Sequence, residues 1–401
     1  MNYAIVTTFF IKILSKLIKV PSAPLIEGEN SLLRVVNYCK LNEYNKILIV
    51  TAPFITANSK LNELFEKLRA SNIEFCVFDK VEGEPTFHLC EEVKHTAMEE
   101  NVDVIVAVGG GSVIDLCKVV CAGVKDDKPL IKFSGILKVR KKPLPLFAVP
   151  TTAGTGSETT FIAVISDSQG QKRTVISPKI VPQLAVLDCN LLVNMPAKLT
   201  ASTGIDALSH AIESYISTQK TNGHSFYAPT AVNIIFNNLK KCVNEPENKI
   251  ARQKMLKASY LAGISMNKEM VGYAHAFAHQ LGAFYNIPHG QAIAMVLVKV
   301  LHFQREKCQS KLAELGIAIG LDESLGEEIL SKLFIEKVAN LIREIGLPQY
   351  CKQVEKKDYK QITANAFKET AFRYPVCKFM SKEDAYKFLD RLDEEEISLW
   401  D

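Results

Sequence analysis

The chain has 401 residues, of which 47% are hydrophobic and 23% are charged, and its formal net charge is +4. This length predicts two domains, and the composition is that of an ordinary soluble globular protein. So small a charge gives no reason to expect nucleic-acid binding. Ten cysteines are scattered without a Cys-x-x-Cys pair. This excludes a zinc knuckle or a thioredoxin-type motif and favours reduced, buried thiols in a cytoplasmic protein.

The first twenty residues contain an apolar run from Ala4 to Leu14 that Lys12 interrupts. A membrane span needs about 20 apolar residues, so this run is too short to cross a bilayer. No small-x-small cleavage site precedes Pro21, as a signal peptide would require. We expect an amphipathic helix packed on the body of the protein and no membrane partner, with attachment to a membrane surface as the alternative.

Short apolar runs rich in β-branched residues alternate with helical patterns in the first half of the chain. They predict buried strands at Lys46–Thr51, Ile73–Phe78, Val102–Val108 and Leu144–Val149. The helical patterns between them cover Ser59–Ala70, Phe87–Glu100 and Val113–Val124. Strands that alternate with helices in this way predict an open, mostly parallel sheet covered by helices on both faces.

From about Leu199 onward, β-branched runs become rare and helical patterns fill the chain. The clearest of these patterns cover Thr203–Ser217, Pro229–Cys242, Ile250–Ser265, Ala274–Phe284 and Ala292–His302. We therefore predict an α/β domain over residues 1–198 and an all-helical domain over residues 199–401. The acidic run at 390–396 is expected to be a solvated helix end.

Two loops follow successive predicted strands and contain the residue types that nucleotides need. In Gly109-Gly-Gly-Ser112, adjacent glycines would let backbone N–H groups approach a pyrophosphate, and the helix start adds a favourable dipole. A tight structural turn is the alternative, since the run is not G-x-G-x-x-G. Asp115, one turn further, would either act as a capping acid or face the ligand.

The second loop is Thr151-Thr-Ala-Gly-Thr-Gly-Ser157. Its hydroxyls and small residues would line an adenine or ribose pocket, or the loop is only a connector. Ligands of open α/β sheets bind at the carboxyl ends of the strands. Two such loops at the ends of successive strands therefore favour a nucleotide site over two connectors.

The helical half contains a candidate metal site. Asp206 and His210 are four residues apart and share one face of a predicted helix. His275, His279 and His289 form a second cluster downstream, and residue types alone do not choose among them. Several nitrogen ligands with one oxygen ligand suit iron(II) or zinc better than magnesium or calcium. A solvated helix face with a local Asp–His hydrogen bond is the alternative.

Taken together, these runs resemble the iron-containing (group III) alcohol dehydrogenase family. The resemblance extends from about residue 22 to Phe388, nearly the whole chain. The segments that carry it are Gly109-Gly-Gly-Ser-Val-Ile-Asp115, Pro150-Thr-Thr-Ala-Gly-Thr-Gly-Ser-Glu158, Thr203-Gly-Ile-Asp-Ala-Leu-Ser-His-Ala-Ile-Glu213 and His275-x3-His279-x9-His289-Gly290.

The resemblance implies a dehydroquinate-synthase-like architecture. In it, a dinucleotide-binding α/β domain precedes a helical domain, and the active site lies in the cleft between them. It implies a metal site made by Asp206, His210, His275 and His289. It gives His279 the place of a cleft histidine near the nicotinamide, and it implies a homo-oligomer, most simply a dimer.

The same resemblance assigns the nucleotide site. The pyrophosphate would be held by Gly109, Gly110, Gly111 and Ser112. The nucleotide pocket would be lined by Thr151, Thr152 and Thr160. Lys172 would reach the ribose.

The chain departs from the family pattern at two positions. Members specific for NAD often have an aspartate just after the first strand, where this chain has Ala52. Without that carboxylate nothing repels a 2′-phosphate, so the cofactor is NAD or NADP. Near the C-terminus the usual Tyr-Pro-Val-Pro is Tyr374-Pro-Val-Cys377, for which we expect only a local change.

The implied activity is that of a metal-dependent NAD(P) alcohol dehydrogenase or aldehyde reductase acting on a small primary alcohol. Fe2+ is the expected cation, with Zn2+ or Mn2+ as alternatives. The cation would stabilise the alkoxide, and the carbinol hydrogen would move as hydride to the nicotinamide. His279 would pass the proton towards solvent or serve only as a hydrogen-bond partner. Glu213 is expected to orient a helix or a ligand.

Two other functions are compatible with these residues. One is a zinc-dependent polyol dehydrogenase resembling glycerol dehydrogenase, although Thr155-Gly156-Ser157 lacks the acidic residue that such enzymes use for polyols. The other is a non-catalytic module that binds a nucleotide or a metal.

Overall fold

In a computed structural model of the chain, the described residues are 21–219 and 226–394. They form two compact units that divide between Asn194 and Met195. The boundary predicted at residue 198 falls in the first turn of α7 (Ala197–Ile216). The predicted N-terminal amphipathic helix and the end of the acidic run lie outside the described residues. Within the described part of the chain, no helix is long and apolar enough to cross a membrane.

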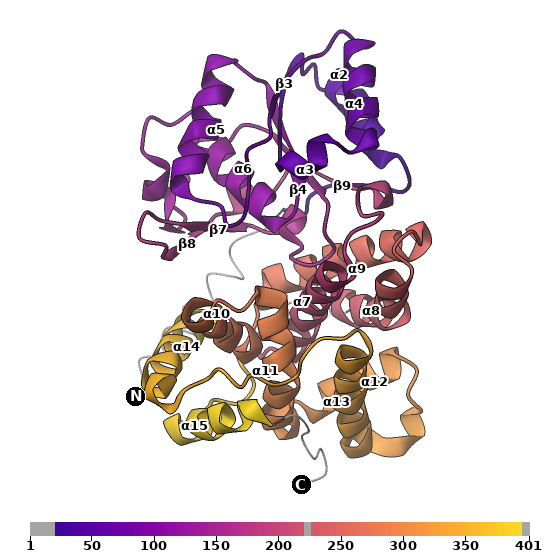
Figure 1. Cartoon of the computed structure of the whole chain (residues 1–401), viewed down its shortest axis with the longest axis vertical. Helices are drawn as coiled ribbons and strands as arrows, with labels where there is room; N and C mark the ends of the chain where they lie inside the picture. The colour runs from indigo at the N-terminus through magenta and orange to yellow at the C-terminus, as the bar shows by residue number, and fades with distance from the viewer. Residues whose placement is uncertain (1–20, 220–225, 395–401) are drawn as a thin grey trace. The chain divides into compact units, whose positions relative to one another are not determined.

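The unit formed by residues 21–194 is built on a six-stranded sheet (Figure 1). The strand order is β1-β9-β6-β4-β2-β3, and all neighbouring strands are parallel, which confirms the predicted parallel sheet. The strands are β1 (Leu25–Glu27), β2 (Lys46–Thr51), β3 (Glu74–Phe78), β4 (Val104–Gly109), β6 (Leu146–Pro150) and β9 (Leu184–Leu187). The helices are α2 (Val35–Leu41), α3 (Pro53–Thr56), α4 (Ser59–Arg69), α5 (Phe87–Glu99) and α6 (Gly111–Gly123).

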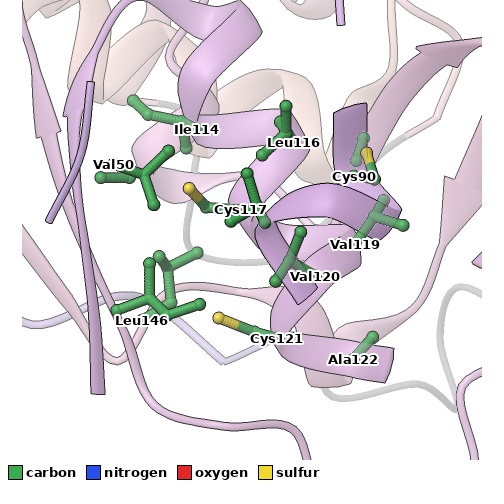
Figure 2. Close-up of a cluster of buried hydrophobic side chains, with 14 of the residues drawn as sticks. Val50, Cys90, Ile114, Leu116, Cys117, Val119, Val120, Cys121, Ala122 and Leu146 are labelled. Atoms are coloured by element: carbon green, nitrogen blue, oxygen red, sulfur yellow. The ribbon is translucent and has the colours of Figure 1, made fainter. Parts of the chain in front are cut away.

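The central strands are covered on both faces. Every residue of β4 is buried, as expected for a continuous apolar run in the middle of a parallel sheet. Successive side chains of a strand point to opposite faces. Leu146 and Val50 join the apolar cluster that α5 and α6 cover (Figure 2). On the opposite face, Phe147 packs edge-on against Tyr38 of α2, with the ring centroids 5.2 Å apart.

Cysteines form part of this core. Figure 2 shows Cys90, Cys117 and Cys121 among the apolar side chains around α6. All ten cysteines are free, and eight of them are buried. Burial raises the pKa of Cys39 to about 12 and also raises the pKa of Cys90, Cys117 and Cys121, so these four thiols are poor nucleophiles that act as small apolar side chains.

A second sheet in the same unit was not predicted. It consists of β5 (Gly135–Ile136), β8 (Lys172–Ile176) and β7 (Ile162–Ser166), with β8 in the middle, parallel to β5 and antiparallel to β7. β8 begins with two exposed basic residues and lacks the continuous apolar run that marks a buried strand. In the larger sheet, β1 and β9 were also missed, because they have only three and four residues.

The unit formed by residues 195–394 is helical, and its described residues include no strand, as predicted. The central helix α7 packs against α8, α9 and α11. The helices that follow α7 are α8 (Tyr227–Asn244), α9 (Lys249–Glu269), α10 (Tyr273–Tyr285), α11 (His289–Gln304), α12 (Gln309–Ala318), α13 (Gly326–Glu344), α14 (Tyr359–Arg373) and α15 (Lys382–Asp390).

Candidate metal centre and nucleotide loops

The central helix α7 carries the first pair of candidate metal ligands. Most residues of α7 are small or apolar, and 14 of its 20 residues are buried. Gly204 allows a close approach, since a Cβ there would lie 2.2 Å from the Leu239 side chain of α8. Asp206 and His210 therefore lie one turn apart inside the unit, only 4% and 6% exposed. An ionisable pair buried this deeply requires a compensating partner.

Two further helix starts bring histidines to α7. His275 lies in the first turn of α10, and His289 is the first residue of α11. The next residue, Gly290, lies against the backbone of α7, where a Cβ would be 2.3 Å from the carbonyl oxygen of Ser202. Only glycine can lie this close to the backbone of α7. Gly290 therefore allows its neighbour His289 to come close to Asp206.

One carboxylate oxygen is the common neighbour of three imidazoles. Asp206 Oδ1 lies 3.7 Å from His210 Nε2, 3.5 Å from His275 Nε2 and 3.2 Å from His289 Nε2. The rings of His210 and His275 are stacked with their centroids 4.5 Å apart. Ligand atoms about 2.1 Å from one tetrahedral cation are themselves roughly 3.4 Å apart. Each of the three histidines thus lies from Asp206 at about the distance that separates two ligands of one ion.

Unpartnered polar atoms test whether a cation fits. Among the described residues, seven buried side-chain nitrogen or oxygen atoms have no hydrogen-bond partner. Three of them belong to residues of this cluster: Asp206 Oδ1 and His275 Nε2, which lie 3.5 Å apart, and His210 Nδ1, which is not the ring nitrogen near Asp206. An unsatisfied buried polar atom costs about 1–3 kcal/mol. A divalent cation would satisfy a carboxylate oxygen and imidazole nitrogens together, and Asp206, His210 and His275 present ligand atoms within 4.8 Å of one another.

The protonation states also suit a cation. Burial would raise the pKa of Asp206, but the neighbouring histidines outweigh it and hold that pKa well below its usual value. Burial lowers the pKa of His210 to about 4, so its ring is neutral at pH 7. Burial also acts to lower the pKa of His275, but the neighbouring carboxylates of Asp206 and Glu213 raise it to about 9. Two carboxylates thus place a negative potential on His275, where a cation would displace the proton.

Glu213 connects the metal cluster to the start of α10. Its Oε2 lies 2.6 Å from His275 Nδ1, and its Oε1 accepts a 2.7 Å hydrogen bond from the backbone N–H of Ala274. Gly272 makes room for this carboxylate, since a Cβ there would lie 2.7 Å from Glu213 Oε1. When Nδ1 of His275 carries the proton, Nε2 is free to coordinate, so Glu213 fixes the ring in its ligating form.

His279 lies beside the cluster without joining the atoms around Asp206. It is one turn beyond His275 on α10, and its ring stacks on that of His289 with centroids 5.2 Å apart. Its Nδ1 is 2.7 Å from Glu369 Oε1, and its side chain is 34% exposed. His275 and His279 share one helical face, which explains why spacing alone did not choose between them.

The two candidate nucleotide loops lie at the same edge of the parallel sheet. β4 and β6 are neighbours in register, with Gly109 opposite Pro150, so their carboxyl ends meet. Gly110 precedes the first turn of α6, whose N–H groups have no partner within the helix. A Cβ on Gly111 would lie 2.7 Å from the Thr155 side chain, and one on Gly110 would lie 3.4 Å from Thr152 Oγ1. The glycines therefore let the two loops pack against each other.

Asp115 has a different role from the predicted cap. Its carboxylate accepts hydrogen bonds from Ser157 Oγ at 2.5 Å and from the backbone N–H of Val164 at 2.9 Å, and it makes no bond to the start of α6. Of the two roles considered for Asp115, the capping role is not observed, because β7 and the Ser157 turn, distant in sequence, supply other donors. Thus Asp115 ties α6 to the second loop. The role facing the nucleotide stays a prediction.

Lys118, which sequence reasoning missed, completes this tie. The side chain is fully buried, and its Nζ donates to Ser157 Oγ at 2.8 Å, Thr160 Oγ1 at 2.7 Å and the carbonyl oxygen of Ile162 at 2.8 Å. A lysine among the buried apolar residues of α6 was the available signal. Lys172, at the start of β8, is exposed and pairs with Glu84 at 2.9 Å.

Glu158, in the same loop, predicts a pH dependence of stability. Burial raises its pKa from 4.5 to about 7. The folded state binds the proton of Glu158 more tightly than the unfolded state does. The contribution of this proton to the free energy of unfolding is therefore fully present below about pH 4.5 and is lost as the pH rises through about 7. Glutamine does not titrate, so the Glu158→Gln variant is expected to lose up to about 3 kcal/mol less stability than the wild type over this pH range. Urea denaturation of both proteins at several pH values would check this prediction. The same pH dependence of the free energy of unfolding in both proteins would contradict it.

Sequence comparisons define the class to which this fold and site belong. The model of the family "Iron-containing alcohol dehydrogenase" matches residues 22–189, and "Fe-containing alcohol dehydrogenase family, C-terminal" matches residues 200–392. The chain belongs to the iron-containing alcohol dehydrogenase family and is an oxidoreductase, as its sequence motifs predicted. The family implies a metal and a nicotinamide nucleotide.

Individual members of the family are similar to the chain over most of its length. The chain is 32% identical over 361 residues to alcohol dehydrogenase 4 of Saccharomyces cerevisiae, covering 89% of this chain and 93% of the yeast protein. It is 32% identical to the NAD-dependent methanol dehydrogenase of Bacillus methanolicus, covering 87% and 93%. A crystal structure of 1,3-propanediol oxidoreductase matches with a TM-score of 0.88 and 30% identity, covering 94% and 100%. These matches do not favour the zinc-dependent polyol dehydrogenase or a non-catalytic module.

Proposed function

We propose that the protein is an Fe2+-dependent dehydrogenase that interconverts small primary alcohols and aldehydes with NAD or NADP. The single observation that carries the metal assignment is the convergence of buried ligand atoms from Asp206, His210 and His275 within 4.8 Å of one another, where Asp206 Oδ1 and His275 Nε2 have no hydrogen-bond partner. His289 completes the proposed ligand set, with its Nε2 3.2 Å from Asp206 Oδ1. Three imidazoles and one carboxylate suit iron(II), zinc or manganese, and the family favours iron.

The bound groups would supply the redox chemistry: the cation as Lewis acid on the alcohol oxygen and the nicotinamide as hydride acceptor. The chain's own residues would prepare that chemistry. Glu213 would keep His275 in its ligating form, and His279 would take the proton that the alcohol loses. In the other unit, the loop from Gly109 to Ser112 and the threonines at 151, 152 and 160 would hold the nucleotide, and Lys172 would reach its ribose.

The proposed substrates follow from the relatives, whose names include methanol and 1,3-propanediol. Metal-free protein would be loaded anaerobically with Fe2+, Zn2+ or Mn2+ and tested with methanol, ethanol, propane-1,3-diol and glycerol, using each nucleotide. We expect the fastest NAD(P)H formation with iron and a primary alcohol. A preference for zinc with glycerol would instead support the polyol dehydrogenase, and no turnover with any combination would contradict the proposal.

Ala52 predicts the nucleotide preference. It is the residue after β2, next to the β4 strand that leads into the glycine loop, and it is 6% exposed. A carboxylate at this position would repel a 2′-phosphate and accept a bond from a 2′-hydroxyl. Replacing Ala52 with aspartate is therefore expected to lower the ratio of NADP to NAD kcat/KM by about tenfold, which corresponds to roughly 1.4 kcal/mol.

Ala52→Asn is the matched control for this prediction, because it adds the same volume without the charge. A ratio that is unchanged in the aspartate variant, or lowered equally in both variants, would remove the argument from this position. We further propose, from the family alone, a homodimer in the cytoplasm, which sedimentation velocity and cell fractionation would test.

A further inference from the structure

The hydrogen bond between His279 and Glu369 points to a function for the helix α14. His279 Nδ1 is 2.7 Å from Oε1 of Glu369, which is on α14. The same Oε1 accepts a 2.6 Å hydrogen bond from the hydroxyl of Tyr374. α14 packs along α10, the helix that carries His279 (Figure 1). One carboxylate oxygen thus connects the histidine to a tyrosine 95 residues later in the chain.

This arrangement determines which nitrogen of His279 carries the proton. An ionised carboxylate can only accept hydrogen bonds, so Glu369 Oε1, which accepts from the Tyr374 hydroxyl, accepts its second hydrogen bond from an N–H at His279 Nδ1. In a neutral imidazole with a proton on Nδ1, the lone pair is on Nε2. Nε2 is on the other side of the ring, so it points away from Glu369 and is free to accept a proton.

The low solvent exposure of Glu369 and Tyr374 strengthens both hydrogen bonds to the carboxylate. Glu369 is 18% exposed at its side chain, and Tyr374 is 8% exposed, so water competes weakly for the carboxylate. Hydrogen bonds to an ionised acceptor are about twice as strong as neutral ones. The ring of His279 is held between Glu369 at one edge and the stacked ring of His289, 5.2 Å away. Both its tautomer and its orientation are therefore set by neighbours.

We propose that Glu369 and Tyr374 are positioning residues that hold His279 as the Nδ1–H tautomer, with its Nε2 ready to take the alcohol's proton. The inference rests on the proposed function, in which His279 is the proton acceptor. With the opposite tautomer, Nε2 would already carry a proton and could not accept another. Tyr374 is the first residue of the Tyr374-Pro-Val-Cys377 run. The proposal therefore assigns a function to one residue of that run.

Nuclear magnetic resonance tests the positioning directly on metal-free protein. Long-range 15N–1H correlation spectra distinguish the two tautomers, and His279→Gln identifies the His279 signals. We expect the Nδ1–H tautomer in the wild type and a shift towards the Nε2–H tautomer in Glu369→Gln, whose amide can donate to Nδ1. A wild-type Nε2–H tautomer, or a spectrum unchanged by Glu369→Gln, would overturn the inference.

Kinetics of the iron-loaded enzyme test the consequence. A general base contributes about 10²–10⁴-fold to a rate. Glu369→Gln is expected to lower kcat at least tenfold with little change in the KM for the nucleotide, Tyr374→Phe less, and Glu369→Asp is expected to restore part of the loss. Asp358→Asn is the matched control, since Asp358 also accepts a tyrosine hydroxyl, from Tyr285 at 2.9 Å, but contacts no histidine in the described residues.

The two readouts separate the possible failures. If His279→Gln retains full kcat, the proposed proton acceptor is wrong, and the positioning inference loses its purpose even if the tautomer is as expected. If His279→Gln is impaired while Glu369→Gln and Asp358→Asn both retain full kcat, the proposed function survives and the role of Glu369 is rejected.

Discussion

The His275→Ala variant is expected to purify without bound metal and to lose nearly all alcohol oxidation. Its Nε2 lies 3.5 Å from Asp206 Oδ1, and it is one of the three cluster atoms without a hydrogen-bond partner. Removing a ligand should cost more than the 10–100-fold typical of residues that merely orient ligands. Metal content by plasma mass spectrometry, measured together with NAD(P)H formation, checks both parts of the prediction.

His302→Ala is the matched control for this variant. His302 is near the end of α11, partly buried, and outside the cluster around Asp206. It should retain both metal and activity. Circular dichroism of both variants would establish that each is folded. Retention of metal and activity by His275→Ala would end the metal assignment.

The second large effect is expected at Glu213, which touches a proposed ligand without being one. In Glu213→Gln the amide oxygen can still accept from the Ala274 N–H, but the amide nitrogen then faces His275 Nδ1. A donor at that position makes Nδ1 the acceptor and places the ring proton on Nε2, the atom needed for coordination. We expect a 10–100-fold loss of metal affinity, measured by competition with a chelator.

Ser214→Ala provides the comparison for Glu213→Gln. Ser214 is the next residue of α7, it is fully buried, and its hydroxyl bonds to that of Ser265 at 2.8 Å. Its loss should lower stability without changing metal affinity. Equal metal affinities in the two variants would show that Glu213 supports the fold and not the ligand.

The central strands and the long helices were predictable because their signals are local. β2 and β4 are continuous apolar runs, and the helices of the second unit repeat their apolar residues at helical spacing. β7 and β8 were missed because their pairing, Ile162 opposite Ile176, is a property of the fold rather than of either segment.

The candidate site was predictable to the same extent. Asp206 and His210 are one turn apart, so the sequence alone identified them as a pair. The hydrogen-bond partners that fix the histidines were not visible in this way, because Glu369 is 90 residues from His279. Lys118 was missed for the same reason, since its three acceptors come from a turn and a strand about 40 residues later.

X-ray absorption spectroscopy of the iron-loaded, anaerobic protein tests the central claim most directly. We expect one iron per chain with only nitrogen and oxygen ligands and with scattering from about three imidazoles, as three histidines and one aspartate would give. With ten cysteines in the chain, sulfur is the real competitor. Sulfur ligands near 2.3 Å, or a first shell without imidazole scattering, would contradict the proposed centre.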